Sequence, residues 1–453
     1  MTTDILPNDI LLEIFNHCRE DILCSWWWEP LAHVCQRWRQ IIFDSPQSLH
    51  LMVSCNGKTP TRTSLDIWPP FPIAITYFPR GVYIHCEDNI IAALEHRGRV
   101  SQITFHRLRG HESKIIFDVL REPFPALTYL HISCTSNRPM PPPFFPEQFL
   151  GGCAPHLRSF SLGGVRFPKF PEAVLSASHL VTLRLWDIPT YDGSISPEAM
   201  ATSLVAWPNL KDLYIQFQHP HSRHQISLPP PTRAVLPALT YIHLSGASDY
   251  LDDLVSRIDT PLLERLEIYF LADHILDIPE LQKFIDRTER LKPLNRAEIK
   301  FPFLGIAIAL GLGSSTHLQL DIRCQYPGAG ILMMAHVCSG LSPLISHVEQ
   351  LDLSKNTFSE GDWGIDVEPS LFSLFKLFTG VRSLSVSGEL LPLIAPALRR
   401  LAGERATEVF PHLHSISFTG PPPSESIRKD IDALFSVRQY FNCPIIVYWS
   451  NEI

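Results

Sequence analysis

The six residues Leu180-Val181-Thr182-Leu183-Arg184-Leu185 show a pattern that recurs along most of the chain and indicates its architecture. The pattern is apolar–x–x–apolar–x–apolar, and it predicts a short strand whose alternate side chains point to opposite faces. Further clear copies begin at Leu127, Leu157, Leu210, Leu239, Leu263, Val348, Val381 and Leu413, and weaker ones at Val100, Leu294 and His317. Successive copies start about 28 residues apart on average, a spacing typical of repeat proteins.

Between copies the chain has room for a return segment of about 20 residues, which in repeat arrays is often helical. No single unit can bury its apolar face alone, whereas stacked units share one elongated core. A generic α/β domain is the alternative, but such a domain does not repeat one motif along its length. Several copies follow a lead-in that contains proline, such as Phe124-Pro125-Ala126-Leu127 and Phe410-Pro411-His412-Leu413.

The repeated strand resembles that of the leucine-rich-repeat family. That family places Asn or Cys eight residues after the first Leu, and here only Asn356 matches. The resemblance therefore implies an irregular leucine-rich-repeat-like α/β solenoid over residues 97–424, with a curved parallel sheet and helices on its outer side.

Two segments flank the expected solenoid. Residues 51–96 contain strand-like stretches that should start the sheet, at Leu51–Cys55, Ala74–Phe78 and Val82–Cys86. Residues 425–453 contain an amphipathic pattern from Ile427 to Phe441, followed by the apolar stretch Ile445–Trp449. We expect a helix and a strand there, which together form a C-terminal cap.

The first 50 residues have a helical rather than a strand pattern. Pro7 suits a first helical turn, and apolar residues recur after it at three- and four-residue steps, at Ile10, Leu11, Ile14, Phe15 and Cys18. A second helical element runs from Leu31 to Ile42. Short helices with this much apolar surface cannot bury all of it within about 50 residues. The remaining face needs a partner, either the rest of the chain or another protein.

Four pieces of this segment resemble the F-box pattern, in the same order: Leu6-Pro7, Ile14-Phe15, Val34-Cys35-Gln36-Arg37-Trp38-Arg39 and Ser45-Pro46. The stretch from Arg19 to Pro30, with Trp26-Trp27-Trp28, is similar to the expanded loop of F-box-like proteins of basidiomycete fungi. The resemblance covers residues 4–50 and departs from the family at Leu49, where Trp is frequent.

The F-box resemblance implies a domain over residues 1–50 that binds a Skp-type adaptor and, through it, a cullin. The residues implied to help contact the adaptor are Leu6, Pro7, Leu11, Ile14, Val34 and Trp38. The alternative is a helical cap that only covers the first core face of the array.

Composition bounds the other function classes. The 453 residues are 45% hydrophobic and 19% charged, with a net charge of -8 and no run of Lys or Arg. Nucleic-acid binding needs a basic face, so none is expected. The residues from Met1 to Phe15 lack a basic start, and the apolar run Phe301–Gly313 is too short to span a membrane. The ten cysteines lack CxxC pairs. An intracellular protein, cytoplasmic or nuclear, is expected.

Catalytic and cofactor motifs are not found in the sequence. The chain has no Gly-x-Ser-x-Gly, no phosphate-binding loop and no His-Glu-x-x-His, and we expect no enzyme activity and no cofactor. Two groups contain residue types that can bind a metal ion. The group His17, Cys18, Cys24, His33 and Cys35 matches no zinc module, and the group His219, His221 and His224 is interpreted as a solvated loop between repeats.

Partner specificity is expected on the strand face that points away from the core. The second and third x positions of the motif copies point there, at Tyr129, His131, Arg184, Tyr214, Tyr241, His243, Arg265, Glu267, Asp321 and Asp352. Tyr and Arg are frequent in interface hot spots. The expected function is the substrate-recognition subunit of a Skp-cullin-F-box type ubiquitin ligase, with a protein target on the repeats. The alternative is a non-catalytic scaffold that binds proteins without ubiquitin transfer.

Overall fold

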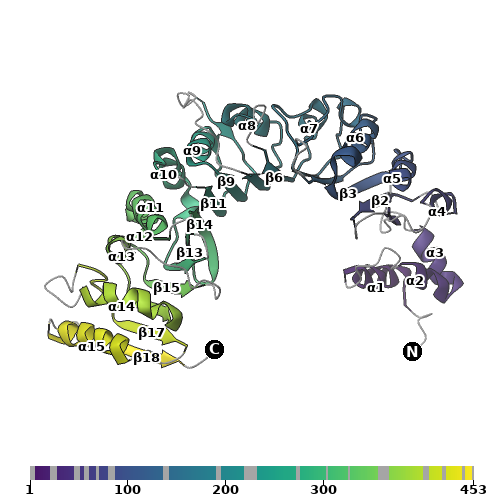
Figure 1. Cartoon of the computed structure of the whole chain (residues 1–453). Coiled ribbons are helices and arrows are strands. Elements are labelled where there is room, and N and C mark those ends of the chain that lie inside the picture. The colour runs from purple at the N-terminus through teal and green to yellow at the C-terminus, as the bar shows by residue number, and fades with distance from the viewer. Residues whose placement is uncertain are drawn as a thin grey trace. The chain divides into compact units, whose positions relative to one another are not determined.

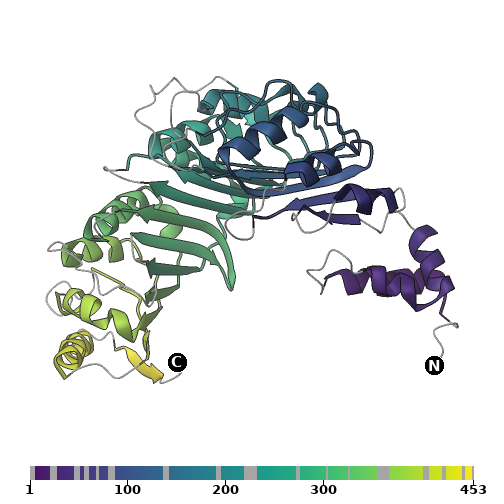
Figure 2. The same ribbon diagram turned by 45° about the vertical axis from the view of Figure 1, so that its right-hand side comes forward.

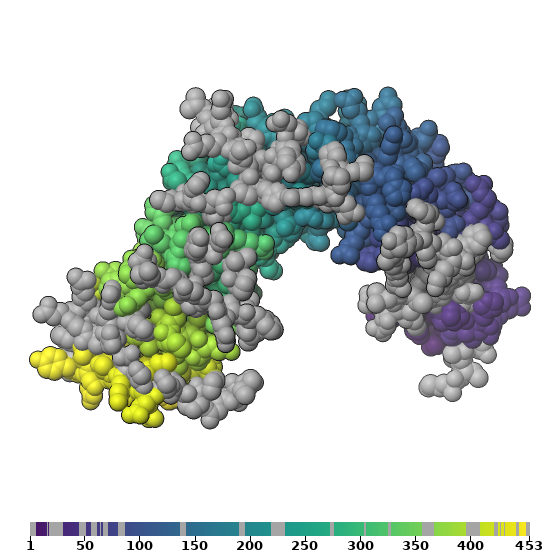
Figure 3. All heavy atoms as spheres, in the orientation of Figure 1, coloured from purple at the N-terminus to yellow at the C-terminus, as the bar shows by residue number. Residues whose placement is uncertain are grey.

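The computed structural model describes residues 6–20, 28–44, 51–55, 61–67, 71–79, 87–135, 142–189, 195–218, 232–271, 276–302, 305–324, 327–355, 367–400, 408–420, 425–440 and 444–450. The remaining residues are grey in Figure 3. The expected strand at Val82–Cys86 and the histidines at 219, 221 and 224 lie outside the described residues.

The chain divides into two compact units. Unit 1 comprises residues 1–195 and 203–210, and unit 2 comprises residues 196–202 and 211–453. The division falls within the segment 97–424. Sixteen strands form one mostly parallel sheet in the order β1-β2-β3-β4-β5-β6-β7-β9-β11-β14-β13-β12-β15-β16-β17-β18. The α/β class is confirmed.

The elements of unit 1 are α1 (Asn8–Glu20), α2 (Trp28–Val34), α3 (Gln36–Asp44), β1 (Leu51–Ser54), α4 (Thr61–Ile67), β2 (Ile73–Tyr77), α5 (Glu87–Leu94), β3 (Val100–Leu108), α6 (Gly110–Val119), β4 (Tyr129–Cys134), η3 (Leu150–Gly152), β5 (Ser159–Gly163), α7 (Glu172–Leu175) and β6 (Thr182–Ile188). Helix α8 (Pro197–Leu204) has residues in both units.

The elements of unit 2 are β7 (Asp212–Phe217), β8 (Ala234–Val235), β9 (Tyr241–Gly246), α9 (Ser248–Ser256), β10 (Ile258–Asp259), β11 (Arg265–Leu271), α10 (Pro279–Arg287), η4 (Glu289–Leu291), β12 (Arg296–Phe301), β13 (Ile306–Leu312), β14 (Ser315–Arg323), α11 (Pro327–Gly340), α12 (Ser342–Ile345), β15 (Gln350–Lys355), α13 (Val367–Phe375), β16 (Ser383–Ser387), η5 (Gly388–Leu390), α14 (Leu391–Arg400), β17 (Ser415–Thr419), α15 (Glu425–Tyr440) and β18 (Ile446–Ser450). The expected C-terminal helix and strand are α15 and β18.

The apolar motif positions form the core beneath the helices. In β4, Leu130 and Ile132 are fully buried, and the same holds for Leu183 and Leu185 in β6. The helices that follow β2 lie on this buried side of the strands in each unit (Figures 1 and 2). The opposite side, which we name the open face, carries the x residues of the motif copies.

The proline lead-ins fold as turns that start the strands. The N–H of Leu127 donates to the carbonyl of Phe124 at 3.1 Å, with Pro125 between them. Proline suits this second turn position because its φ is already fixed near the required value. The same bond joins Leu157 to Ala154, Leu210 to Trp207, Leu239 to Leu236, Leu263 to Thr260 and Leu413 to Phe410. The first residue of each of these turns is buried.

The motif copies also share one backbone contact with the next copy. The carbonyl of Thr128 accepts the N–H groups of Arg158 at 2.8 Å and Ser159 at 3.1 Å. The same paired acceptance recurs at the carbonyls of Arg158, Lys211, Thr240, Asn295, Glu349 and Arg382. Each of these is the first x residue of its copy, so the copies have a common register.

The expected wholly parallel order is wrong between β11 and β15. Here β12, β13 and β14 are successive antiparallel strands, and their spatial order is reversed, so that β14 pairs with β11 and β12 pairs with β15. The β13–β14 connection is a two-residue turn whose Gly313 has a φ of 62°. Such a turn reverses the chain within one hairpin. The weak copy at His317 is also displaced, because Leu318 pairs with Leu266.

The helical segment α1 to α3 packs against the start of the sheet. Leu11, Phe15, Ala32, Ile41 and Ile42 share one buried cluster with Leu51 and Phe71. The second helical element expected from Leu31 to Ile42 is divided at Cys35 into the two helices α2 and α3. The Sγ of Cys35 accepts the N–H of Trp38 at 3.4 Å. The Arg37 guanidinium donates to Asn8 Oδ1 at 2.9 Å and to the carbonyl of Leu6, which ties α3 to the start of α1.

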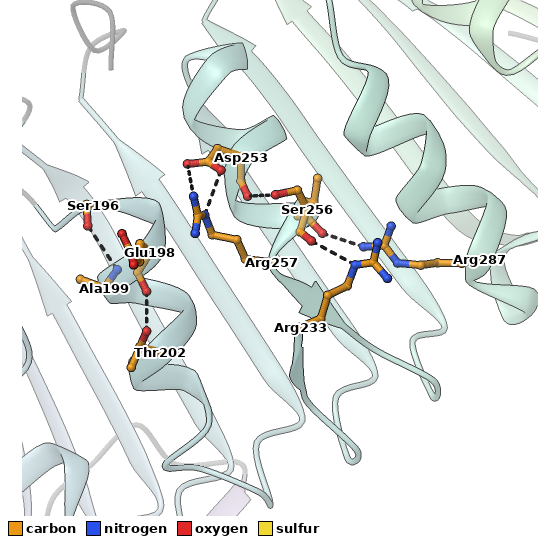
Figure 4. Close-up of polar contacts among 10 residues, drawn as sticks. Ser196, Glu198, Ala199, Thr202, Arg233, Asp253, Ser256, Arg257 and Arg287 are labelled. Atoms are coloured by element: carbon orange, nitrogen blue, oxygen red, sulfur yellow. Dashed lines mark hydrogen bonds and ion pairs between the residues drawn. The ribbon is translucent and has the colours of Figure 1, made fainter. Parts of the chain in front are cut away.

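Polar side chains complete the ends of α8 and α9 (Figure 4). Ser196 Oγ accepts the N–H of Ala199 at 3.2 Å at the start of α8. At the end of α9, Arg287 Nη2 donates to the carbonyl of Val255 at 2.7 Å and Arg233 Nε to that of Ser256 at 3.1 Å. The last carbonyls of a helix lack intrahelical donors, so these arginines serve the fold.

Candidate functional site

The open face of unit 2 brings together six side chains from the three neighbouring strands β7, β9 and β11. We name them the Glu267 cluster: Tyr214, Tyr241, His243, Arg265, Glu267 and Tyr269. Strand register aligns them, because Tyr214 lies beside His243 and His243 beside Glu267. Five of the six were predicted as partner-binding residues.

Glu267 is the centre of the cluster. Its Oε2 accepts the hydroxyl of Tyr241 at 3.0 Å and lies 3.1 Å from His243 Nδ1, while its Oε1 pairs with the Arg265 guanidinium. Burial by itself raises the pKa of Glu267, but the hydrogen bonds from His243 and Tyr241, together with Arg265, lower it to about 2. Glu267 is therefore a fixed negative charge held by three donors.

The rings of the Glu267 cluster stack in a row. The ring of His243 lies parallel to that of Tyr214, with centroids 4.0 Å apart, and 4.7 Å from that of Tyr269 on its other side. The hydroxyl of Tyr269 accepts a hydrogen bond from Gln319 Nε2 at 2.9 Å. Rings locked by neighbours on both sides lose little freedom on binding a partner, which favours affinity.

Asp321 lies on β14 beside Tyr269. Burial raises the pKa of its carboxyl to about 6, although the nearby Arg323 acts in the opposite direction. Its Oδ1 is shielded from solvent and has no hydrogen-bond donor among the described residues. A buried charge without a donor destabilises the fold.

We expect Asp321→Asn to raise the free energy of unfolding at pH 7 by on the order of 1 kcal/mol, because the amide is neutral. The sign follows from the raised pKa. Between pH 6 and about 4 the folded carboxyl holds a proton that the unfolded chain releases, so the wild type gains stability as the pH falls. The asparagine variant should lack that gain. Urea unfolding at pH 7 and at pH 4.5 checks this, and a loss of stability at pH 7 would contradict it.

The open face of unit 1 carries a second row of rings, which we name the ring row: Phe78, His106, His131 and Trp186. Their successive centroids are 5.1, 4.5 and 4.9 Å apart. His131 on β4 and Trp186 on β6 are in contact across β5, which lies between them. At Gly163 of β5, a Cβ would lie 2.3 Å from the Trp186 indole. Glycine is required here because the indole rests on its backbone.

His131 is the titratable centre of the ring row. Burial, followed by the nearby His106 and Arg184, lowers its pKa to about 4. Its Nε2 is buried and has no hydrogen-bond partner among the described residues. The imidazole is therefore neutral at pH 7, and the ring row presents aromatic faces with the positive charge of Arg184 nearby.

The other predicted partner-binding residues lie apart from these groups. Tyr129 is half-buried on β4 and pairs in register with Ser159. Asp352 on β15 accepts a hydrogen bond from Arg296 at 2.7 Å. Sequence reasoning missed Phe78, His106, Trp186 and Tyr269. Trp186 and Tyr269 continue the strand alternation one step beyond the motif, and this pattern would have found them.

The residues predicted to contact an adaptor are distributed over the helical segment. Leu6 and Trp38 are half-buried, and Trp38 packs on Phe15 with ring centroids 4.8 Å apart. Leu11 is 1% exposed and lies in the core of the segment. Pro7 is exposed, as are Ile14 at 43% and Val34 at 58%.

Ile10 adds to the apolar surface of the helical segment, and it was not among the predicted contacts. It is 42% exposed and lies one turn before Ile14 on α1, so both side chains lie on the same side of the helix. Part of the apolar surface expected to need a partner is covered by Leu51 of β1 and by Phe71, which precedes β2. Ile10, Ile14 and Val34 stay uncovered.

Among the described residues, no group of three His, Cys, Asp or Glu side chains is arranged to hold a metal ion. His17, His33 and Cys35 are exposed on the helical segment. In the described part of the chain, no helix is both long enough and apolar enough to cross a membrane.

No protein-family model matches the chain, and no curated protein is found to be similar to it.

Proposed function

We propose that the chain is the substrate-recognition subunit of a Skp-cullin-F-box type ubiquitin ligase, with no catalytic activity of its own. In this proposal the helical segment is the F-box and binds a Skp-type adaptor. The strands and helices that follow are an irregular leucine-rich-repeat-like solenoid, whose open face holds a protein target. Ubiquitin transfer is performed by enzymes that the adaptor and a cullin recruit, which raises their effective concentration at the target.

The observation that carries the proposal is the uncovered apolar surface at Ile10, Ile14 and Val34. The segment is small, and its described residues Leu11, Phe15, Ala32, Ile41 and Ile42 pack inward in one cluster with Leu51 and Phe71. Exposed apolar side chains gathered on one short module favour a partner protein. The order of Leu6-Pro7, Ile14-Phe15 and Val34 to Arg39 in the sequence supports an adaptor of the Skp type as that partner.

The open faces support a protein target as the second partner. The Glu267 cluster and the ring row present Tyr, Trp and Arg side chains, which are enriched at interface hot spots. The net charge of -8 and the lack of any run of Lys or Arg do not favour a nucleic-acid backbone as the target. The second candidate function is a scaffold that binds proteins through the same surfaces without ubiquitin transfer.

The proposal is tested by purifying the full chain with a co-expressed Skp-type adaptor. We expect the wild type to retain the adaptor. We expect Ile14→Asp combined with Val34→Asp to weaken binding by on the order of 30-fold or more, because an unpaired carboxylate would be buried in the interface. Leu332→Asp is the matched control, since Leu332 is a similarly exposed apolar residue on helix α11, and it should keep the adaptor.

Failure of the wild type to bind the adaptor would overturn the F-box assignment, as would equal binding by the double variant with unchanged circular dichroism. Adaptor binding without recruitment of a cullin would favour the scaffold function.

A further inference from the structure

Strand β18 forms one edge of the sheet and carries apolar side chains on both of its faces. Within the described residues it pairs only with β17, in parallel. Ile446 and Tyr448 are 60% and 54% exposed on the open face, and Trp449 is 45% exposed on the helix side, where its ring stacks on Phe418 with centroids 4.5 Å apart. An exposed edge of this kind is a template for another strand.

The backbone of β18 shows which groups face outward. The N–H of Ile446 donates to the carbonyl of His414 at 2.9 Å, so the backbone groups of Ile446 point toward β17. Backbone groups of successive residues in a strand point to opposite sides. The N–H and C=O of Val447 therefore point away from the sheet, and those of Trp449 do the same.

The usual devices that protect a sheet edge are missing from this strand. Natural edges carry charged residues, proline or bulges. The stretch Ile446-Val447-Tyr448-Trp449-Ser450 has neither charge nor proline, and it pairs with β17 in unbroken register. A charged peptide would find no opposite charge on this strand to pair with. A second neutral strand could bind without burying any unpaired charge.

We propose that β18 is a self-association surface, at which two copies of the chain join through antiparallel pairing of their β18 strands about a two-fold axis centred on Val447. In this register the two Val447 residues exchange both backbone hydrogen bonds. Ile446 then lies opposite Tyr448 of the second copy, and Ile445 opposite Trp449. Every exposed apolar side chain of one strand covers one of the other, which is the self-complementarity that a two-fold interface needs.

The proposal is tested by sedimentation velocity of the full chain between about 1 and 100 µM, the range in which a small interface is populated. We expect the mass to rise with concentration from 51.4 kDa toward twice that value. Val447→Pro removes the outward N–H and leaves the bonds to β17 intact, since proline is tolerated at such edge positions. It should weaken dimerisation at least 10-fold.

Two further variants keep the test independent of folding. Tyr448→Lys places a charge opposite Ile446 of the second copy without changing the backbone, and it should also weaken the dimer at least 10-fold. Val447→Thr keeps both the N–H and the shape, and it should dimerise as the wild type does. A wild type that stays at 51.4 kDa throughout, or a Val447→Pro and a Tyr448→Lys variant that dimerise normally, would overturn the proposal. Adaptor binding is unaffected in either case, because β18 does not belong to the helical segment.

Discussion

Replacing Trp207 by alanine is expected to lower the free energy of unfolding by about 3–5 kcal/mol. Among the described residues, Trp207 is the largest fully buried side chain, and it holds the first position of a proline turn that starts a strand. Its ring packs edge-on against Phe170 with centroids 5.1 Å apart, and its Nε1 donates to the buried carbonyl of Val174 at 2.9 Å. Alanine would leave a cavity and would remove one of the two donors to the Val174 carbonyl, which also accepts the N–H of Ala177 at 3.1 Å.

Two companion variants separate these causes. Trp207→Phe keeps most of the ring and loses only the N–H, so about 1–3 kcal/mol should be lost. Val205→Ala changes an exposed residue two positions away and should alter the free energy of unfolding by less than about 0.5 kcal/mol. Urea unfolding followed by circular dichroism measures all three. If Trp207→Ala unfolded at the same urea concentration as Val205→Ala, the packing described at this turn would be wrong.

Glu267→Gln is expected to cost about 3 kcal/mol above pH 5, the value that corresponds to a pKa lowered from 4.5 to about 2. The direction follows from the lowered pKa. The carboxylate stabilises the fold fully above its unfolded pKa of about 4.5, and this contribution is lost as the pH falls toward 2. The wild type should therefore approach the stability of the glutamine variant as the solution is acidified from pH 5 to pH 2.

The matched control for this prediction is Glu264→Gln. Glu264 pairs with Arg290 at 2.7 Å, but its side chain is mostly exposed, so removal of its charge should change stability by less than about 1 kcal/mol. Unfolding midpoints measured at several pH values give the difference in stability between each variant and the wild type. The contributions of the other titrating side chains are common to both proteins and cancel in this difference. Parallel curves for the wild type and Glu267→Gln between pH 2 and pH 5 would refute a structural role for this charge.

Most strands of the sheet could be predicted from the sequence, because their determinants are local. An apolar residue at the first, fourth and sixth motif positions places three side chains in the core, and a proline such as Pro125 or Pro237 begins the turn before them. The reversed order of β12 to β14 could not be predicted in the same way. The run Phe301–Gly313 has strand character, but the partner that a strand selects depends on contacts distant in sequence. No hairpin was predicted in this run from the sequence.

The candidate surfaces could be predicted in part for the same reason. Alternation along one strand identified His243 and Glu267 as outward residues, yet their contact depends on the register between two strands. The helical periodicity of α1 also left one ambiguity. Ile10 and Leu11 are adjacent and both apolar, and the pattern does not indicate that Leu11 enters the core while Ile10 stays exposed. That choice is made by Leu51 and Phe71, which lie outside the segment.

The reversed placement of β12, β13 and β14 also bears on how the chain can fold and how it could have evolved. In a regular repeat protein, each repeat contacts only the repeats next to it in sequence. Such a structure can fold one repeat at a time, and it can gain or lose whole repeats in evolution. Here the sheet can extend beyond β11 only after β14 has formed, because β14 is the strand that pairs with β11. Likewise β15 pairs with β12 and not with β14, the strand that precedes it in sequence. Antiparallel hairpins form within microseconds, so the three strands can assemble first as a local nucleus on which both flanks condense. Deletion of any one of these three strands would leave a neighbouring strand without its pairing partner. We therefore expect this region of the sheet to tolerate a change in length poorly.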